Sequence, residues 1–573
     1  MRVLLAGLTV FTLAAATSNP RLVTLADFPD GGLTMGPRDV HVYLPSGYAE
    51  TNERYRVIYF NDGEGVFGSL HGSRGVQTDA DYTLDRLLEE KLVHPAILVA
   101  VANAKGVPNG RGRDLVPRWT PDAPGRAEEY LTFLSTRLKP HIDFHFRTMP
   151  EARYTGIAGN SLGGLAAFYF GYRHPEMFGM AICFSPSLWS ADSKLVRDVE
   201  ADSVTRHTTR FWIDGGEKDS ADIETIAPVM TKLLVGKGWR EGEEIAFQLG
   251  YGHLHGRTAM RERLRDALYF MLRREAPAVG GLALRSLADP SATVLDLATA
   301  GERAMVWPEV RYEHGFYLNS VAIPLHVEDT KVAAVDDTGP GRIRAVAPGR
   351  TTLRAEFKGW KAQLPVTGYQ PGEYARLSIG RSPGNAVVDG DLGEWPALPH
   401  YIAPGRDERS ASARFAAAYD DRYLYVAVAV ADPRIVIRPD RLSAEQDGVE
   451  VWLDGRPDPA RAESKAWADG FQSTFLLVRA TPSAVPVPSP SLRAPLPKDV
   501  KSAVRVTPSG YNAEFAFPIE VLHSLQGGAW REFRLNVHVT DFVGGDEPRS
   551  DLWWQPAWRS MDARAGSGTF RRE

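Results

Sequence analysis

The chain of 573 residues contains only one cysteine, Cys183. A single thiol cannot form a disulfide within the chain, so the fold must depend on its hydrophobic cores. After residue 20 the sequence has no apolar run long enough to cross a membrane. The formal net charge is only -5, which gives no reason to expect nucleic acid or another polyanion as a partner. The length predicts about three or four globular domains.

The first 20 residues have the layout of a secretory signal peptide. Arg2 precedes an apolar run over residues 3–15, and small residues follow at Ala14, Ala16 and Ser18. The run is too short to span a bilayer. No cysteine follows it, so a lipid anchor is not expected. We therefore expect a secreted or periplasmic protein whose mature part begins near residue 21.

Residues 21–276 alternate short apolar strands with amphipathic helices, which predicts an α/β sheet covered by helices on both faces. The predicted strands are 40–44, 57–60, 96–101, 154–158, 180–184, 210–214 and 245–249. The predicted helices are 83–90, 127–139, 162–173, 225–236 and 258–273. Ligands of such sheets gather at the carboxyl ends of the strands.

The strand end after residues 154–158 has the pattern of a nucleophile elbow. Gly159 and Gly163 flank Ser161 in a GxSxG turn between a strand and a helix. A strand that turns sharply into a helix brings backbone against backbone, so only residues without a Cβ fit around a strained serine. The first N–H groups of the helix, starting with that of Leu162, would then face an oxygen that becomes negative during acyl transfer.

Two later strand ends carry the partners that a serine nucleophile needs. One is followed by an acidic loop in which Asp219 is the preferred acid, with Glu217 and Asp214 as alternatives. The other is followed by GYGHLHG, where either His253 or His255 could be the base. The order serine, acid, histidine is that of α/β-hydrolases. In that arrangement the histidine takes the serine proton and the carboxylate orients the imidazole.

Residues 38–272 resemble the putative-esterase family of α/β-hydrolases. This family includes feruloyl, acetylxylan and enterochelin esterases and S-formylglutathione hydrolases. The matching stretches are VHVYLPSGY (40–48), RYRVIYFNDGEGVF (54–67), LKPHIDFHFRT (138–148), GIAGNSLGGLAAFYFGYRHPEMFG (156–179), FSPSLW (184–189) and KGWREGEEIAFQ (237–248). The resemblance implies Ser161 as nucleophile, Asp219 as acid, His255 as base and the N–H of Glu64 as a second oxyanion donor. The doublet GHLH departs from the single histidine that is common in the family.

The composition changes after residue 276. Residues 277–370 show short alternating segments punctuated by Gly and Pro, which predicts a small β-sandwich. The stretch VAAVDDTGPGRIRAVAPGRTTLRAEFKG within it resembles a bacterial immunoglobulin-like (Ig-like) domain, a kind of domain that commonly acts as a spacer. The predicted fold is therefore multidomain, with an α/β-hydrolase followed by two β-sandwiches, of which the second covers residues 371–573.

The last region resembles a family-9-like carbohydrate-binding module. VDGDLGEWPAL (388–398), AYDDRYLYVAVAVAD (418–432), DGVEVWLDG (447–455) and GYNAEFAFP (510–518) carry the resemblance, and period-two alternation predicts its strands. Such modules stack aromatic rings on sugars. The candidate sugar contacts are Trp452, Trp553, Trp554 and Trp558. Asp420, Asp421, Asp447 and Glu450 could gather a calcium ion, but acidic turns are common and we predict no metal and no cofactor.

These features together predict an exported serine esterase. Its substrates would be feruloyl or acetyl esters of polysaccharide, cleaved through an acyl-Ser161 intermediate. One alternative is a periplasmic siderophore esterase of the enterochelin type. Another is a carbohydrate-binding surface protein without activity. The sequence indicates no nucleic-acid partner, no membrane span and no particular oligomeric state.

Overall fold

The computed structural model divides the chain into two compact units. The first contains residues 1–283, 308–324 and 356–360, and the second contains 284–307, 325–355 and 361–573. The structure describes residues 19–33, 35–70, 77–119, 125–216, 219, 221–251, 253, 255–287, 290–298, 303–336, 339–369, 377–382, 386–402, 411–438, 446–456, 475–482, 487–488, 497, 499–542, 550–554 and 568–572. Apart from residues 19 and 20, the predicted signal peptide lies outside these ranges. None of the helices they contain is long and apolar enough to cross a membrane.

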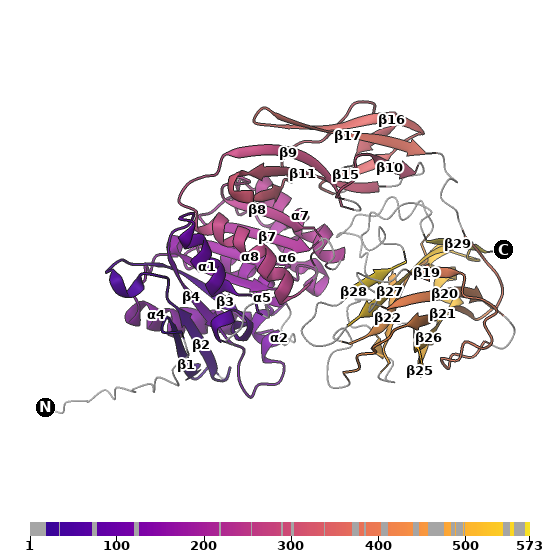
Figure 1. Cartoon of the computed structure of the whole chain (residues 1–573), viewed down its shortest axis with the longest axis horizontal. Coiled ribbons are helices and arrows are strands. Elements are labelled where there is room, and N and C mark those ends of the chain that lie inside the picture. Colours follow the sequence, from indigo (N-terminus) through magenta and orange to yellow (C-terminus); the bar gives the residue numbers. More distant parts are fainter. Residues whose placement is uncertain are drawn as a thin grey trace. The chain divides into compact units, whose positions relative to one another are not determined.

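The first unit is built around an eight-stranded sheet in the order β1-β2-β4-β3-β5-β6-β7-β8 (Figure 1). The strands are β1 (Leu22–Phe28), β2 (Arg38–Tyr43), β3 (Arg56–Asn61), β4 (Ala96–Val101), β5 (Thr155–Asn160), β6 (Met180–Phe184), β7 (Arg210–Gly216) and β8 (Ile245–Gly250). β1, β2 and β4 pair antiparallel, and all later pairs are parallel. This strand order is that of an α/β-hydrolase, as the sequence predicted.

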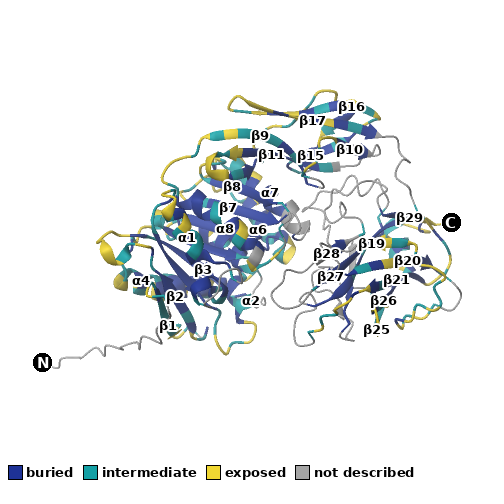
Figure 2. Cartoon of the chain, in the orientation of Figure 1, coloured by how far each residue is buried: buried dark blue, intermediate teal, exposed yellow. Residues whose placement is uncertain are grey.

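Helices cover both faces of this sheet. They are α1 (Ala80–Glu89), α2 (Gly110–Leu115), α3 (Ala127–Phe133), α4 (Lys139–His145), α5 (Leu162–Arg173), α6 (Ser190–Ala201), α7 (Ala221–Gly236) and α8 (Arg257–Leu272). α1 and α8 share one buried apolar cluster with Ile182 and Trp212. On α5, Phe168 contacts Phe211, the neighbour of Trp212. Because successive strand residues point to opposite faces, α5 covers the other face. The buried strands are the dark layer between the helices in Figure 2.

Three elements of this unit were not predicted. These are β1, whose sequence LVTLADF does not alternate apolar with polar residues, α2, whose sequence GRGRDL has one apolar side chain, and α6, which is mostly polar. The helix predicted over 127–139 instead continues to His145, through the segment Leu134–Leu138 and α4. Pro140 lies at the start of α4, directly after the π-helical segment Leu134–Leu138, where the regular helical hydrogen-bond pattern is already interrupted.

Residues 308–324, which we call the return segment, belong to the first unit although they follow the α/β sequence. The segment contains the end of β11 (Arg303–Tyr312) and β12 (Tyr317–Asn319), which pair antiparallel. Asn319 accepts a hydrogen bond from the N–H of Leu249 at 2.7 Å and donates one to the Tyr251 hydroxyl at 2.8 Å. The Tyr317 hydroxyl donates to the carbonyl of Leu249. The return segment therefore lies along the carboxyl end of β8.

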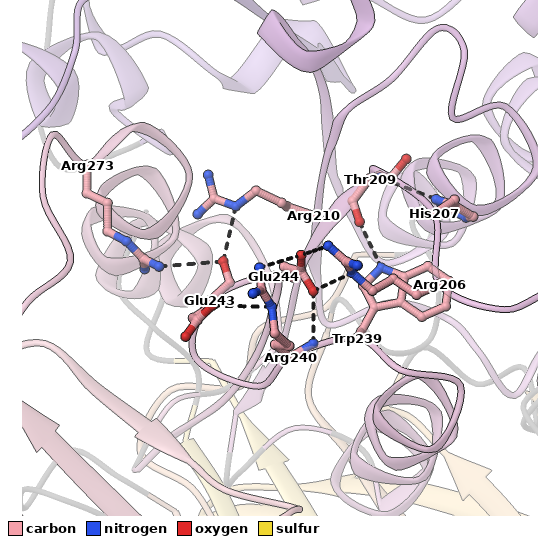
Figure 3. A network of polar contacts seen from close by, with 9 residues as sticks. All are labelled: Arg206, His207, Thr209, Arg210, Trp239, Arg240, Glu243, Glu244 and Arg273. Carbon is pink, nitrogen blue, oxygen red and sulfur yellow. Dashed lines mark hydrogen bonds and ion pairs between the residues drawn. The ribbon is translucent and has the colours of Figure 1, made fainter.

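The amino ends of β7 and β8 are joined by a polar network (Figure 3). Glu244 accepts hydrogen bonds from the Arg206 guanidinium, from the Arg240 guanidinium at 2.8 Å and from the Arg240 N–H at 3.1 Å. Arg210 and Arg273 donate to the carbonyl of Glu243. Burial opposes ionisation of Glu244, but the hydrogen bonds from Arg206 and Arg240 lower its pKa to about 2. The network therefore favours the folded state when Glu244 is ionised.

We expect Glu244→Gln to lower the free energy of unfolding by about 1 kcal/mol at pH 7, a value kept small because Arg206 and Arg240 are half exposed. A folded pKa below the unfolded one stabilises the protein above pH 4.5, the ordinary pKa of Glu, and this stabilisation is lost as the pH falls toward 2. The variant and the wild type should therefore converge near pH 2–3. Urea unfolding of the variant and the wild type at pH 7 and near pH 2–3 measures this difference in stability. An equal difference at both pH values would contradict the prediction.

The second unit contains only β-structure and one helix among its described residues. In the middle region, β10 (Leu295–Ala298), β17 (Trp360–Tyr369), β16 (Gly349–Phe357) and β13 (His326–Val327) form one sheet. The first part of β11 pairs with β15 (Arg342–Ala345), which pairs with β14 (Ala333–Val335). β9 (Val279–Ser286) also pairs with β11. This all-β region fits the small Ig-like sandwich that the sequence predicted.

The C-terminal part is a β-sandwich with one buried core. One sheet has the order β18-β29-β27-β22-β23-β24, with β28 beside β27, and the other β19-β20-β21-β26-β25. The bounds are β18 (Leu377–Ile379), β19 (His400–Ile402), β20 (Ser412–Tyr419), β21 (Tyr423–Ala431), β22 (Gly448–Asp454), β23 (Phe475–Ala480), β24 (Val487–Pro488), β25 (Lys501–Thr507), β26 (Gly510–Pro518), β27 (Glu532–Asp541), β28 (Ser550–Trp553) and β29 (Thr569–Arg572). Helix α11 (Ile519–Gln526) starts directly after Pro518.

Candidate active site

Ser161 lies between the end of β5 and the start of α5, where the sequence predicts the nucleophile. Its backbone has φ 60° and ψ -119°, a conformation that costs a residue with a side chain of order 1–3 kcal/mol. Its side chain is only partly buried. Leu162 is the first residue of α5, so its N–H has no acceptor within the helix. A strained, accessible hydroxyl therefore lies beside a free backbone donor.

Backbone contact excludes a side chain at Gly159, and Gly163 lies against side chains of the turn after β3. A Cβ on Gly159 would lie 2.5 Å from the carbonyl carbon and oxygen of Gly163. A Cβ on Gly163 would lie 3.0 Å from a carboxylate oxygen of Asp62. A Cβ on Gly164 would lie 2.8 Å from the carbonyl oxygen of Phe184. The crowding expected from the sequence is therefore present on both sides of Ser161.

Asp219 and His255 form the acid–imidazole pair. His255 Nδ1 lies 2.8 Å from Asp219 Oδ1. The Asp219 side chain is fully buried, whereas that of His255 is 37% exposed, so the imidazole can be reached from outside. Burial opposes ionisation of Asp219, but the attraction and hydrogen bond of His255 and the hydrogen bond of Ser185 lower its pKa to about 2. The pair therefore provides an ionised carboxylate behind an accessible imidazole.

The alternatives that the sequence left open occupy other positions. His253 Nε2 lies 3.3 Å from Glu262, and burial, with help from Arg263, lowers the pKa of His253. Asp214 is buried and lies 3.1 Å from Arg263 Nε. Glu217 lies outside the described residues. Of the two histidines in the GHLH doublet, the structure brings His255 to Asp219.

The turn after β3 approaches the elbow through side-chain contacts. Asn61 donates to the carbonyl of Gly163 at 3.0 Å. Arg111 on α2 contacts both carboxylate oxygens of Asp62, at 2.6 and 2.9 Å. The Glu64 carboxylate accepts from the Asn103 N–H at 2.7 Å. These contacts fix the turn that contains Glu64, the residue predicted to supply a second oxyanion donor.

Gly63 in the same turn has no room for a side chain. Its Cβ would lie 2.6 Å from backbone atoms of residues 100–102 at the end of β4. The turn is therefore packed directly against the neighbouring strand.

Several residues near the site were missed by the sequence reasoning. Ser187 Oγ lies 3.2 Å from Ser161 Oγ, and Ser185 Oγ donates to Asp219 Oδ2 at 2.6 Å. Both serines belong to the FSPSLW stretch, which carried the family resemblance without indicating their roles. Arg263 contacts Ser185. It lies on the apolar stripe of α8, three residues after Met260 and four before Ala267. An arginine on the apolar face of a helix is unusual, so its position could have indicated a buried polar contact.

The predicted sugar-binding tryptophans have different surroundings. Trp452 on β22 is half-buried, and its indole N–H donates to Glu450 at 3.4 Å. Trp554 packs on the sandwich core, with ring centroids 4.8 Å from Phe415 and 5.8 Å from Phe570. Trp553 belongs to β28, and Trp558 lies outside the described residues. Trp554 thus has a packing role in the core of the sandwich.

Within the described part of the chain, three buried carboxylates could hold a metal ion. Asp432, Asp447 and Asp541 offer oxygen atoms within 4.8 Å of one another. Of the four acidic residues suggested by the sequence, Asp447 belongs to this group. Glu450 instead pairs with Arg479 and His538. Burial and the charges of Asp432 and Asp541 raise the pKa of Asp447 to about 8.

We expect the C-terminal domain to become less stable as the pH rises from 4 to 8 in the presence of a chelator. The unfolded chain releases the Asp447 proton near the ordinary pKa of 3.8, whereas the folded domain keeps it until about pH 8. A divalent cation would replace that proton, so Ca²⁺ at pH 8 should raise the melting temperature by several degrees. Asp447→Asn removes the titrating group and should flatten the pH dependence. Thermal unfolding with and without Ca²⁺ measures both effects, and a pH-independent wild-type melting temperature would contradict the prediction.

The strand order and the strained serine at the turn from β5 to α5 define an α/β-hydrolase with a serine elbow. Residues 33–259 match the family model described as "Putative esterase". Residues 395–555 match the one described as "Carbohydrate family 9 binding domain-like". The chain therefore contains one region that matches an esterase family model and a second region that matches a carbohydrate-binding family model.

Three known proteins are similar to parts of this chain. A bifunctional "Endo-1,4-beta-xylanase/feruloyl esterase" from Xylanibacter ruminicola is 33% identical over 143 residues, which are 24% of this chain and 18% of that protein. A "Siderophore enterobactin esterase" from Emericella nidulans is 32% identical over 71 residues, 12% and 23% of the two chains. The match thus spans less than a quarter of either relative. A solved "ferulic acid esterase" is 20% identical with a TM-score of 0.35, covering 44% of this chain and 97% of its own.

Proposed function

We propose that the protein is an exported serine esterase that hydrolyses feruloyl or acetyl esters of polysaccharide. Its C-terminal domain would hold the polysaccharide and so raise the local concentration of ester. The observation that carries this proposal is the contact between buried Asp219 and accessible His255, in a hydrolase whose Ser161 lies at a strained turn.

The reaction follows from the chemistry of these groups. With its Nδ1 proton donated to Asp219, His255 presents Nε2 as a base for the Ser161 proton. The Ser161 oxygen attacks the ester carbonyl, the alcohol leaves with the proton from His255, and an acyl-Ser161 remains. Water then attacks the acyl group with the same base, which releases the acid and restores the serine. No cofactor takes part in these steps.

The oxyanion of each tetrahedral intermediate would be held by backbone N–H groups. The N–H of Leu162 is the donor at the start of α5, and the N–H of Glu64 is the second. The contacts of Asp62 with Arg111 and of Glu64 with Asn103 support this role, because they hold the turn in place beside the elbow. Removal of one such donor in a serine hydrolase lowers kcat by about 10²–10³.

The carbohydrate-family domain and the xylanase-linked feruloyl esterase relative favour a polysaccharide ester over a siderophore. A small soluble trilactone offers no polymer for such a domain to bind. The enterobactin esterase relative keeps the siderophore as the competing substrate class. The two classes differ in the alcohol that leaves, so substrate comparison separates them.

The full chain should release ferulate or acetate from esterified xylan, measured by chromatography of the free acid, and should turn over a catecholate trilactone poorly. Preferred cleavage of the trilactone would instead establish the siderophore esterase. An inactive protein that still binds xylan would establish the non-catalytic binding protein. Binding is measured with full-length Ser161→Ala by retardation in native gels containing xylan, because this variant leaves the polymer intact.

A further inference from the structure

We propose that Ser185 and Arg263 are positioning residues for the acid of this hydrolase. The Asp214–Arg263 pair fixes the Ser185 hydroxyl, and that hydroxyl holds Asp219 in the orientation that serves His255. This inference rests on the proposed function and extends it to residues that do not touch the substrate. It is carried by a continuous series of short contacts from β7 through α8 and the end of β6 to His255.

The contacts among Asp214, Arg263 and Ser185 are between buried groups. Asp214 lies 3.1 Å from Arg263 Nε and also accepts from the Trp212 indole at 2.8 Å. The guanidinium of Arg263 donates to Ser185 Oγ at 2.8 Å. Asp214 and Ser185 are 0% exposed and Arg263 is 1% exposed. A buried arginine that reaches a buried carboxylate on one side and a hydroxyl on the other is fixed at both ends.

The chemistry of the groups sets the direction of the hydrogen bonds. An arginine has donors and no acceptor, so Ser185 Oγ must accept from Arg263. The single hydroxyl proton of Ser185 is then directed to Asp219 Oδ2, 2.6 Å away. The other oxygen, Oδ1, accepts from His255. The carboxylate is therefore fixed through both of its oxygens, and its plane cannot rotate away from the imidazole.

The backbone of Ser185 supports the same arrangement. Its φ of 40° lies in the left-handed region, which a serine rarely adopts. Its N–H donates to Asp214 at 3.1 Å, so the residue contacts Asp214 through its backbone and Asp219 through its side chain. The strained conformation is what allows one residue to bridge two acids.

The charged groups around Asp219 determine how loss of Ser185 would appear in a pH profile. His255 and Arg263 face the carboxylate. Asp214 faces Arg263, and His253 faces both Arg263 and Glu262. Without the Ser185 hydrogen bond, less of the negative charge of Asp219 is balanced by a donor. The carboxylate then favours the imidazolium form of His255 more strongly. That form cannot act as a base, so the acid limb of the rate profile moves to higher pH.

The test uses Ser185→Ala in the full chain with Ser193→Ala as the matched control. Ser193 is also a fully buried serine with positive φ, 51°, and its hydroxyl makes none of these contacts. For a p-nitrophenyl ester, Ser185→Ala should lower kcat/KM by about 10–100-fold, the loss of a hydrogen bond to a charged group. Its acid limb should move upward by a few tenths of a pH unit. Ser193→Ala should keep the wild-type rate and profile.

An active wild type together with an unchanged rate and acid limb in Ser185→Ala would overturn this inference and leave the proposed function intact. A wild type inactive toward every ester would overturn both. If circular dichroism shows that Ser185→Ala is unfolded, Ser185→Cys replaces it, because the thiol keeps the shape and is a weaker donor. Ser185→Cys should then show a smaller loss in the same direction, and a wild-type profile would overturn the inference.

Discussion

Replacing Ser161 by alanine is expected to lower kcat for ester hydrolysis by about 10⁶, the loss seen when a serine hydrolase is deprived of its nucleophile. The proposed acyl intermediate needs the Ser161 oxygen, and neither the Asp219–His255 pair nor the Leu162 N–H can replace it. The measurement is the initial rate with a short-chain p-nitrophenyl ester, compared with spontaneous hydrolysis.

Ser161→Gly distinguishes loss of the nucleophile from loss of the fold. Glycine adopts the φ of 60° without strain, so this variant should be as inactive as Ser161→Ala but more stable than the wild type. The gain should be about 1 kcal/mol, the backbone strain less the greater chain entropy of glycine. Activity above about a hundredth of the wild type in both variants would show that another residue is the nucleophile.

Replacing Asp219 by asparagine is expected to lower kcat by about 10⁴. The amide preserves the shape of the side chain but can donate to His255 Nδ1, which would place the imidazole proton on Nε2, where the base must be free. The pKa of Asp219, about 2, means that the wild-type acid stays ionised throughout the neutral range. The loss in Asp219→Asn should therefore be present at every pH from 5 to 9.

Two further variants test whether the loss of rate is specific to Asp219. Asp214→Asn leaves Arg263 partly unpaired, so we expect a clear loss of stability and a smaller loss of rate than in Asp219→Asn. Glu217→Gln tests the other acid of the loop and should keep most of the activity. A 10⁴-fold loss in Glu217→Gln with a mild effect in Asp219→Asn would reverse the assignment.

The sequence predicted the parts of the fold that depend on local pattern. The apolar runs that became β4 and β6 were predicted to the residue, and the GxSxG turn was predicted with its steric reason, because Gly159 and Gly163 meet within five residues. α2 was missed because GRGRDL has no apolar period, and its folding depends on contacts such as that of Arg111 with Asp62. Long-range contacts of this kind leave no local pattern.

The same distinction applies to the site. Asp219 and His255 could be proposed because each follows a strand whose carboxyl end reaches one edge of the sheet. The position of Arg263 on an apolar helix face could mark it as unusual, but its contact with Ser185 could not be predicted, because the two side chains are 78 positions apart and meet in the interior. The residue pattern alone left His253 and His255 open, and only the family resemblance favoured His255, since residues two apart in one loop differ only in which imidazole turns toward the acid.

The return segment has a consequence for how the protein is made. The edge strand β8, which leads into the His255 loop, obtains hydrogen bonds from Asn319 and Tyr317, about 70 residues later in the chain. During synthesis the ribosome must release these residues before that loop can be fixed, so the proposed active site is completed only after much of the middle region has emerged. A gene fragment cut where the α/β pattern stops, at residue 276, would encode an enzyme with an uncovered edge, and one extended past residue 360 would not.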